Sequence, residues 1–206
     1  MKVLLINGSP NEFGCTYTAL KEVSDTLNKN GILTEFLYLG KEAIQSCKAC
    51  HYCFKNKRCV VDDKVNLIVE RSSEFDGIVI GSPVHYASPS GQIISFLDRL
   101  FFSSQKKFSN KLGASVVSAR RAGTISSFDV LNKYFTISNM PIVSSQYWNE
   151  VHGNTVEEVK KDLEGLQTMR TLGTNMAWLL KCIEKGREQG IEDPVLEKRQ
   201  STNFIR

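Results

Sequence analysis

Four cysteines lie within a short segment of the chain, Cys47, Cys50, Cys53 and Cys59. Two residues separate each of the first three, and five more precede the fourth. Thiolates on tight loops are the usual ligands of iron–sulfur clusters, and a fourth ligand can arrive after a short reversal of the chain. Structural zinc usually takes two separated cysteine pairs, which are not seen here. The spacing favours a 4Fe-4S cluster, with free thiols or a redox pair as the alternative.

Cysteine usage and the start of the chain both indicate the cytoplasm. A reducing compartment disfavours structural disulfides, so the six cysteines are better explained by metal or redox chemistry. Met1 and Lys2 precede only four apolar residues before a polar break at Asn7, which does not fit a signal peptide. No apolar run reaches the roughly eighteen residues that a membrane-spanning helix needs. The sequence predicts a cytoplasmic protein that does not bind a membrane.

The overall composition is that of one globular domain. The chain has 206 residues, of which 41% are hydrophobic and 23% are charged, enough to bury a single core. Its formal net charge is only +4, and its basic residues are scattered along the sequence. Nucleic-acid-binding proteins usually gather basic residues on one face. Composition therefore gives no indication of a nucleic-acid partner.

Short apolar segments bounded by Gly, Pro or Ser predict five strands. Apolar and β-branched residues dominate these segments, as is typical of strands in the interior of a sheet. The predicted strands are 3–6, 32–39, 78–80, 112–117 and 142–147. Apolar residues at helical spacing lie between them, for example Leu20, Val23 and Leu27 before Gly31.

The later helices have clearer start and stop signals. Pro89 suits the first turn of a helix, and an apolar stripe that begins at Ile93 follows it. Thr155 and Glu158 have the spacing of a capping box, which predicts the start of a long final helix. Gly186 is the expected end of that helix.

Strands that alternate with helices indicate an α/β fold. Parallel strands need crossover helices, so the pattern predicts a doubly wound, five-stranded, mostly parallel sheet covered on both faces. We expect one domain over residues 1–186 and a polar tail over residues 187–206, either loose or packed as an arm on a partner subunit. Ligands of such sheets bind beyond the carboxyl ends of the strands, so function should lie in the loops after the first, third and fourth strands.

The loop after the first strand, residues 8–16, has the composition of a phosphate-binding loop. Its sequence is Gly-Ser-Pro-Asn-Glu-Phe-Gly-Cys-Thr, and it leads into a helix. Small and hydroxyl-bearing residues, with the free N–H groups of a helix N-terminus, can hold a phosphate without Lys or Arg. The loop lacks the lysine of an ATP-binding P-loop and the glycine spacing of a dinucleotide fingerprint. A flavodoxin-like phosphate loop remains, with an ordinary Gly-Ser-Pro turn as the alternative.

Two further loops make the pattern more specific. The third strand runs into Gly-Ser-Pro-Val-His-Tyr at residues 81–86, and Ala-Arg-Arg-Ala-Gly follows the fourth strand at residues 119–123. In the order of these loops the chain resembles the flavodoxin-fold NAD(P)H-dependent FMN reductase family, and its cysteine-rich insert resembles that of the iron–sulfur flavoproteins within this family. The resemblance covers residues 1–150.

The resemblance implies that FMN is a cofactor. It puts the FMN phosphate at the loop after the first strand and the isoalloxazine ring beside the loop after the third strand. The residues carried over are Ser9, Asn11, Cys15, Thr16 and Tyr17 for the phosphate, Pro83, Val84, His85 and Tyr86 for the ring, and Ser118, Arg120 and Gly123 for the other edge of the ring. No side chain is expected to act as a catalytic acid or base.

Some of these positions leave alternatives open. Cys15 stands where the family often has Asn, so backbone N–H groups should supply more of the hydrogen bonds to the phosphate. His85 stands where a second aromatic residue is frequent, and a surface histidine is its other interpretation. Arg120 and Arg121 are either solvated or stabilise a reduced flavin or the phosphate of a pyridine nucleotide.

These motifs lead to three candidate functions. The first is an iron–sulfur flavoprotein, which exchanges electrons with a small carrier such as ferredoxin, or with NAD(P)H. The second is an NAD(P)H-dependent FMN or quinone reductase without a cluster, and the third is a zinc or redox-sensing module on the same fold. The resemblance also implies a homodimer or homotetramer, in which the cysteine loop of one subunit approaches the flavin of another.

Overall fold

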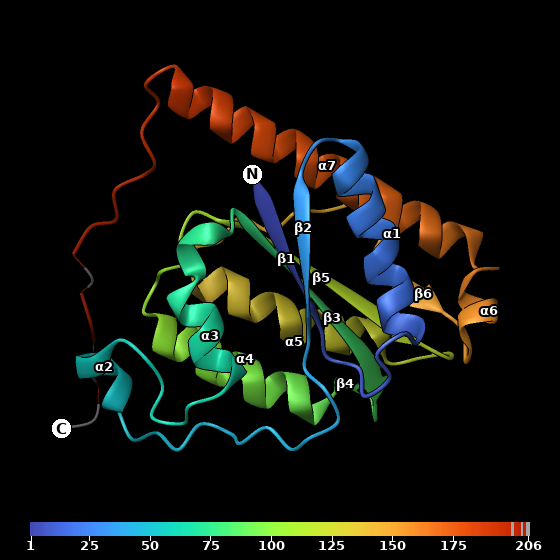
Figure 1. Cartoon of the computed structure of the whole chain (residues 1–206), viewed down its shortest axis with the longest axis horizontal. Helices are drawn as coiled ribbons and strands as arrows, with labels where there is room; N and C mark the ends of the chain where they lie inside the picture. Colours follow the sequence, from blue (N-terminus) through green and yellow to red (C-terminus); the bar gives the residue numbers. More distant parts are fainter. Residues whose placement is uncertain (199, 203, 205–206) are drawn as a thin grey trace.

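A parallel sheet between two layers of helices forms the framework of the chain (Figure 1). The computed structural model describes residues 1–198, 200–202 and 204. Its main strands are β1 (Lys2–Asn7), β2 (Leu33–Tyr38), β3 (Gly77–His85), β5 (Leu112–Ala119) and β6 (Glu150–His152). They lie in the order β2-β1-β3-β5-β6, and all neighbouring pairs are parallel. The predicted doubly wound α/β fold is confirmed, because this strand order is that of flavodoxin-like sheets.

Helices cover both faces of the sheet, as Figure 1 shows. One face carries α1 (Cys15–Lys29), α6 (Val156–Val159) and the long α7 (Leu163–Glu188). The other carries α3 (Lys64–Glu70), α4 (Gly91–Ser104) and α5 (Thr124–Ile137). Leu5 of β1 packs in the first layer, whereas Leu4 and Ile6 pack in the second. Burial on both faces explains why the central strands are continuous apolar runs.

The third predicted strand is longer than expected and ends in a hairpin. β3 runs to His85 and pairs antiparallel with β4 (Ser88–Pro89), a sixth strand that the sequence did not predict. Pro89 lies in this strand, so its prediction as a first helical residue is wrong. Proline is tolerated in an edge strand because the open side needs no ladder hydrogen bond. Ser90 caps α4 instead, by accepting the Ile93 N–H at 3.3 Å.

The prediction of a strand over residues 142–147 is wrong. This segment makes only an isolated bridge to the neighbouring strand, and β6 (Glu150–His152) takes the fifth place in the sheet. The Ser145 hydroxyl lies 2.6 Å from the Tyr147 carbonyl and 2.7 Å from Asn149 Oδ1. A serine that bonds to its own neighbours holds the chain in a turn, and pairing with β5 begins only after it.

The last helix begins and ends at residues other than those predicted. The Thr155 hydroxyl does accept the Glu158 N–H at 3.3 Å, but only the one-turn α6 begins there. Asp162 caps α7, because its carboxylate accepts an N–H of the first turn at 2.9 Å. Gly186 lies inside α7, which continues to Glu188. A second capping residue further along the chain therefore starts the long helix.

The segment after α7 is connected to the helix by an ion pair. Arg187 and Asp193 lie 2.8 Å apart. Beyond Gln189, the residues that the structure describes form neither helix nor strand. In the described part of the chain, no helix has both the length and the apolar character needed to cross a membrane.

A group of ion pairs connects β1, β2 and the segment before β3. Glu35 accepts both terminal nitrogens of Arg71 at 2.8 Å and pairs with Lys2 at 2.5 Å. Arg71 also pairs with Glu74 at 2.7 Å. The hydrogen bonds from Arg71, with a smaller contribution from Lys2, lower the pKa of Glu35 to about 2. Glu35 is therefore ionised at neutral pH.

We expect Glu35→Gln to lower the free energy of unfolding at neutral pH by about 1 kcal/mol, because solvent screens much of this partly exposed pair. A carboxyl whose pKa is lower in the folded state stabilises the fold above its unfolded pKa, and this contribution disappears as the pH falls from 4.5 toward about 2. In urea unfolding, the deficit of the variant should therefore be smaller near pH 3 than near pH 7. A deficit that does not change with pH would contradict the pairing.

Candidate functional site

Parallel pairing brings the carboxyl ends of the strands to one edge of the sheet, where three loops meet. Residues 8–14 follow β1, residues 86–87 follow β3, and residues 120–123 follow β5. The Gly8 N–H donates to the Gly81 carbonyl at 2.9 Å, which connects the first loop to β3. The strand order reverses between β1 and β3, and ligands of open α/β sheets bind at such a switch point.

Hydrogen bonds within the first loop fix its shape. Ser9 is only 4% exposed; its N–H donates to Asn7 Oδ1, and its Oγ accepts the Asn11 N–H, both at 3.1 Å. The Asn7 amide also donates to the Glu12 carbonyl at 2.9 Å. Asn7 was not among the predicted site residues, although an Asn at a strand end before Gly-Ser-Pro is a signal for such a turn. Asn11 is exposed beside it.

The first turn of α1 presents backbone N–H groups to this edge. Gly14 is the N-cap, and no side chain caps the helix. Thr16 is buried, and its hydroxyl bonds to the Ser118 hydroxyl of β5 at 2.8 Å. Tyr17 packs edge-to-face on Phe13, with ring centroids 5.1 Å apart. An uncapped helix N-terminus carries partial positive charge and is suited to an anion.

The second loop is a tight hairpin with an exposed tip. Tyr86 and Ala87 join β3 to β4, and both have positive φ, 49° and 57°. A type I′ turn needs positive φ at both central residues, and residues other than glycine pay a strain for it. Tyr86 and His85 are exposed, whereas Pro83 and Val84 are half-buried beneath them.

The third loop packs directly on the hairpin. Gly123 has a φ of +87°, and a Cβ there would lie 2.8 Å from Ala87 Cα, so a larger residue would push the loops apart. The Ser126 hydroxyl donates to the Ala87 carbonyl at 2.6 Å. Arg120 and Arg121 are exposed at this loop. The structure therefore brings the second and third predicted loops into contact.

Two open cavities lie beside the first loop. One of about 450 Å³ is lined by Asn11, Cys15, Tyr38 and Lys41 together with the start of α6. The other, of about 310 Å³, lies between Lys41, His85 and the start of α4. Lys41 borders both cavities and was not among the predicted site residues. Its position just after β2 was the available signal, because all strand ends meet at this edge.

Cys15 is a neutral thiol at the rim of the first cavity. Its Sγ–H donates to the Gly153 carbonyl at 3.7 Å. Burial raises the pKa of Cys15 above its ordinary value, and the carboxylates of Glu158 and Glu157 raise it further. The side chain therefore connects α1 to the loop after β6, and it brings no negative charge to the first turn of α1.

The cysteine-rich insert folds against the far half of α4. One small pocket is lined by all four cysteines of the motif, Cys47, Cys50, Cys53 and Cys59. Ala49 and His51 have φ of 52° and 56°, and reverse the chain on either side of the second cysteine. Lys57, with φ of 57°, reverses it again after the short helix α2 (Tyr52–Asn56). These reversals let cysteines that are close in sequence face one point.

The four thiols are close enough to affect one another. Burial raises the pKa of Cys53, and the nearby thiols of Cys59, Cys47 and Cys50 raise it further. Among residues 1–198, 200–202 and 204, however, no three Cys, His, Asp or Glu side chains come close enough to hold a single metal ion. The sulfur atoms share a pocket without forming a tight single-ion site.

A buried arginine of α4 holds the insert in place. Arg99 is 1% exposed; its Nε–H donates to Cys59 Sγ at 3.2 Å, and its terminal nitrogens donate to the two oxygens of Asp63 at 2.7 and 2.8 Å. They also donate to the carbonyls of Gln45 and Val61. Burial alone would lower the pKa of Arg99, but the bonds to Asp63 and Cys59 outweigh it and raise the pKa. Arg99 was not among the predicted site residues, although a charged residue within an apolar helix was an available signal.

Asn66 of α3 fixes the main chain around the fourth cysteine. This side chain is 2% exposed, and its Oδ1 accepts the Cys59 N–H at 2.8 Å. Its amide donates to the carbonyls of Cys59 and Val61 at 3.1 and 3.2 Å. The insert is therefore held by polar side chains from two neighbouring helices, α3 and α4.

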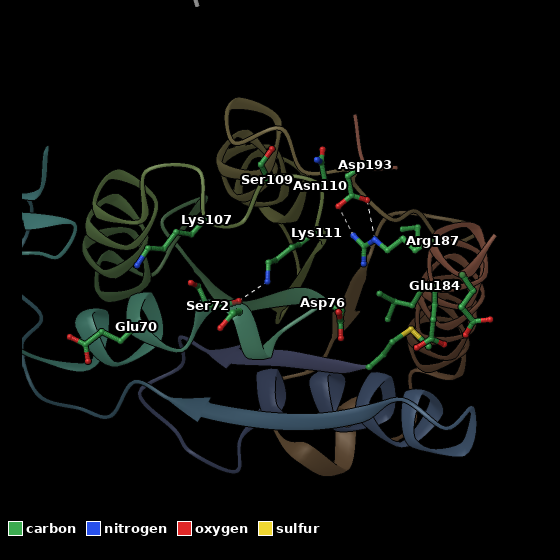
Figure 2. A pocket seen from close by; sticks show the side chains of 15 residues that line it. Glu70, Ser72, Asp76, Lys107, Ser109, Asn110, Lys111, Glu184, Arg187 and Asp193 are labelled. Carbon is green, nitrogen blue, oxygen red and sulfur yellow. Dashed lines mark hydrogen bonds and ion pairs between the residues drawn. The ribbon is translucent and has the colours of Figure 1, made fainter. Parts of the chain in front are cut away.

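A further cavity, of about 930 Å³, lies at the opposite, amino edge of the sheet. Figure 2 shows it between α7 and the segments that flank β3 and β5. Two of its cations are already engaged within the chain: Lys111 donates to the Ser72 carbonyl at 2.6 Å, and Arg187 pairs with Asp193 at 2.8 Å. This cavity is remote from the three loops, so we assign the functional site to the carboxyl edge.

Known proteins match the chain over these same features. The family model described as NADPH-dependent FMN reductase matches residues 1–155. An iron-sulfur flavoprotein of Methanocaldococcus jannaschii is 31% identical over 195 residues, which cover 90% of this chain and 100% of that protein. The iron-sulfur flavoprotein of Methanosarcina thermophila is 26% identical over 193 residues, covering 92% of this chain and 100% of that protein.

A solved flavodoxin from the domain Archaea has the same fold. Its TM-score is 0.58 at 15% identity, and the match covers 88% of this chain and 99% of the flavodoxin. The family match spans the three loops and the cysteine-rich insert, as the resemblance of their motifs predicted. The chain therefore belongs to the NADPH-dependent FMN reductase family, in its iron–sulfur flavoprotein subgroup, and is an FMN-dependent oxidoreductase.

Proposed function

We propose that the chain is an iron–sulfur flavoprotein that transfers electrons between FMN and a 4Fe-4S cluster bound by Cys47, Cys50, Cys53 and Cys59. The observation that carries this proposal is that all four cysteines line one pocket. In a four-iron cluster each thiolate binds a different iron, so the ligands are spread more widely than those of a single ion. Four thiols that share one pocket supply the number and kind of ligands that such a cluster needs.

The chain is proposed to hold FMN with its three loops. The uncapped first turn of α1 is suited to the phosphate, with Ser9 and Asn11 beside it. The bond between Thr16 and Ser118 fixes this turn against β5. When bound, FMN takes up electrons in pairs and can release them singly, which suits exchange with a one-electron cluster.

The second and third loops are proposed to flank the flavin ring. Pro83, Val84 and His85 lie on the hairpin, and Gly123 packs against its tip. Arg120 is exposed at the same edge, where a guanidinium can offset negative charge on the ring or bind a phosphate of NAD(P)H. The chain's contribution is to bind and orient the ring and to place positive charge beside it.

A small electron carrier such as ferredoxin, or NAD(P)H, is the proposed redox partner. The exposed rings of Phe54 and Phe102 lie beside the cysteine pocket with centroids 5.3 Å apart, and His51 packs on Phe54 at 5.1 Å. From residue 43 to residue 61 the sequence has no acidic residue and four basic ones, Lys48, Lys55, Lys57 and Arg58. Exposed aromatic side chains in a segment rich in basic residues support docking of an acidic protein carrier.

We further propose a homodimer or homotetramer in which the cluster of one subunit approaches the flavin of another. The cysteine pocket adjoins Ser103 near the end of α4, whereas the flavin loops adjoin Gly91 at its start. At 1.5 Å per residue these two positions are about 18 Å apart. A neighbouring subunit would supply a shorter path, and exposed Trp148 and Trp178 offer apolar surface for association.

An NAD(P)H-dependent FMN or quinone reductase without a cluster is the second candidate. It is favoured by the description of the matching family, which names FMN reduction with NADPH. In that case the cysteine-rich insert serves only as a lid. The two candidates differ in whether the protein contains iron, and a zinc or redox-sensing module would differ from both in its metal and in its lack of flavin.

Replacing Cys50 with Ala should remove the cluster and leave the flavin in place, because the three flavin loops do not include the insert. Iron, sulfide and flavin analysis with a visible spectrum, all on anaerobically purified protein, measures both cofactors. The variant should still take up electrons into FMN but fail in one-electron exchange with a protein carrier.

Cys15→Ala and Cys182→Ala are the controls, because neither residue lines the cysteine pocket. Both should retain wild-type iron. Wild-type protein with FMN but no iron would favour the cluster-free reductase, and zinc without flavin would favour the sensing module. Equal loss of iron in Cys50→Ala and Cys182→Ala would rule out the proposed ligand set.

Replacing Ser9 or Thr16 with a bulky apolar residue should weaken FMN binding by about tenfold or more, since a hydrogen bond to a charged group is worth roughly 1.5 to 3 kcal/mol. Titration of the apoprotein with FMN, followed by flavin fluorescence, gives the dissociation constant. Thr26→Val is a matched control, because the Thr26 hydroxyl bonds only within α1, to the Glu22 carbonyl at 2.9 Å. Unchanged FMN affinity in the Ser9 and Thr16 variants would move the phosphate to another part of the site.

Light scattering at micromolar concentration should give the mass of a dimer or tetramer of the 23.2 kDa chain. In the proposed arrangement the cluster and the flavin of one chain lie at opposite ends of α4, so a second subunit is needed to bring a cluster close to a flavin. Trp178→Arg should shift the distribution toward smaller species if α7 lies in the interface. A monomer for the wild-type protein would count against the assembly and would require a path along α4 within one subunit.

A further inference from the structure

We infer that Arg99 is a positioning residue that raises the reduction potential of the cluster through its hydrogen bond to the Cys59 sulfur. The inference rests on the proposed function, since it requires a cluster at the cysteine pocket. Arg99 Nε–H lies 3.2 Å from Cys59 Sγ, and the side chain is 1% exposed. A buried guanidinium in contact with a ligand sulfur is therefore a permanent positive charge beside the metal site.

The direction of the effect follows from the charges. A cluster held by four thiolates is anionic, and reduction adds one electron from the carrier or the flavin without breaking any bond. A nearby cation stabilises the more negative, reduced form, and it acts strongly here because it is buried. Hydrogen bonds to the sulfur ligands act in the same sense. Arg99 should therefore make the cluster easier to reduce.

Asp63 determines how much of this positive charge the cluster experiences. Its two oxygens accept the terminal nitrogens of Arg99 at 2.7 and 2.8 Å, which leaves Nε–H for the sulfur. Asp63 is also the N-cap of α3, where it accepts the Val65 N–H at 3.0 Å. Asparagine caps helices about as well as aspartate. Asp63→Asn therefore removes the negative charge and keeps the cap.

A purely structural role for Arg99 makes a different prediction. An anchor for the insert needs only bonds to its main chain, and Asn66 already supplies such bonds around Cys59 without any charge. If Arg99 were only an anchor, removal of Arg99 or of its partner Asp63 would loosen the insert in the same way. A tuning role requires that the two changes move the potential in opposite directions.

The neighbouring pair of Arg58 and Asp62 is a matched control. Its members lie 2.6 Å apart, and Arg58 precedes Cys59 directly in the sequence. Their side chains are 41% and 79% exposed, so solvent screens their charges. The two pairs differ in the burial of the cation, because the Arg99 side chain is 1% exposed whereas that of its partner Asp63 is 33% exposed. The variants to compare are Arg99→Gln, Arg99→Lys and Asp63→Asn for the first pair, and Arg58→Gln and Asp62→Asn for the exposed pair.

The experiment is an anaerobic redox titration of the holoprotein, followed by the electron paramagnetic resonance signal of the reduced cluster. Arg99→Gln should lower the ratio of reduced to oxidised cluster at fixed potential by roughly tenfold, which is about 59 mV for one electron. Asp63→Asn should shift the potential upward, Arg99→Lys should fall between wild type and Arg99→Gln, and both exposed-pair variants should remain near wild type. Iron and FMN content are measured on each sample.

The potentials and the iron content together test whether Arg99 tunes the cluster. Opposite shifts of the cluster's reduction potential in Arg99→Gln and Asp63→Asn support the inference. If Arg99→Gln cannot hold iron, an upward shift of the potential in Asp63→Asn supports the inference by itself. Intact clusters with unmoved or parallel potentials overturn the tuning role and leave the proposed function standing, as does loss of iron from both variants. Wild-type protein without iron would instead overturn the proposed function, and this inference with it.

Discussion

Parallel pairing of the strands is the constraint from which the rest of this structure follows. It brings the carboxyl ends of β1, β3 and β5 to one edge, and it requires helices to cross over on both faces. The three loops of the candidate site can meet only because of it. Local bonds then refine the site, such as that between Thr16 and Ser118, whose residues are far apart in sequence. The sheet therefore positions the loops, and the side chains and N–H groups of the loops form the candidate site.

A second constraint acts on the cysteine-rich insert, which has little apolar core of its own. A buried guanidinium must be paired and fully hydrogen-bonded, because an unpaired buried charge is costly. Arg99 meets this requirement with bonds to Asp63, to two carbonyls of the insert and to Cys59. The same requirement therefore folds the insert against α4 and puts a cation at the fourth cysteine. Asn66 completes the attachment from α3.

The helix α4 connects the two parts of the molecule that could carry electrons. Its start adjoins the loops at the carboxyl edge, and its far half forms one wall of the cysteine pocket. The family match covers residues 1–155 and so includes all three of these loops. The cysteine pocket lies beside the exposed rings of Phe54 and Phe102.

The sequence by itself determined the strand and helix alternation, the three loop motifs and the cysteine spacing, because each depends on residues within a few positions of one another. It predicted Ser9 and Thr16 as site residues, but not that Ser9 bonds within its own loop or that Thr16 bonds to Ser118. Local signals for a helix start also gave a wrong prediction where two of them competed. Thr155 has a good capping box, yet Asp162 is the residue that caps the long helix. Only the tertiary structure decided which residues lie beside Arg99 and Lys41, because those neighbours are on segments distant in sequence, and no local pattern encodes which of those segments will meet.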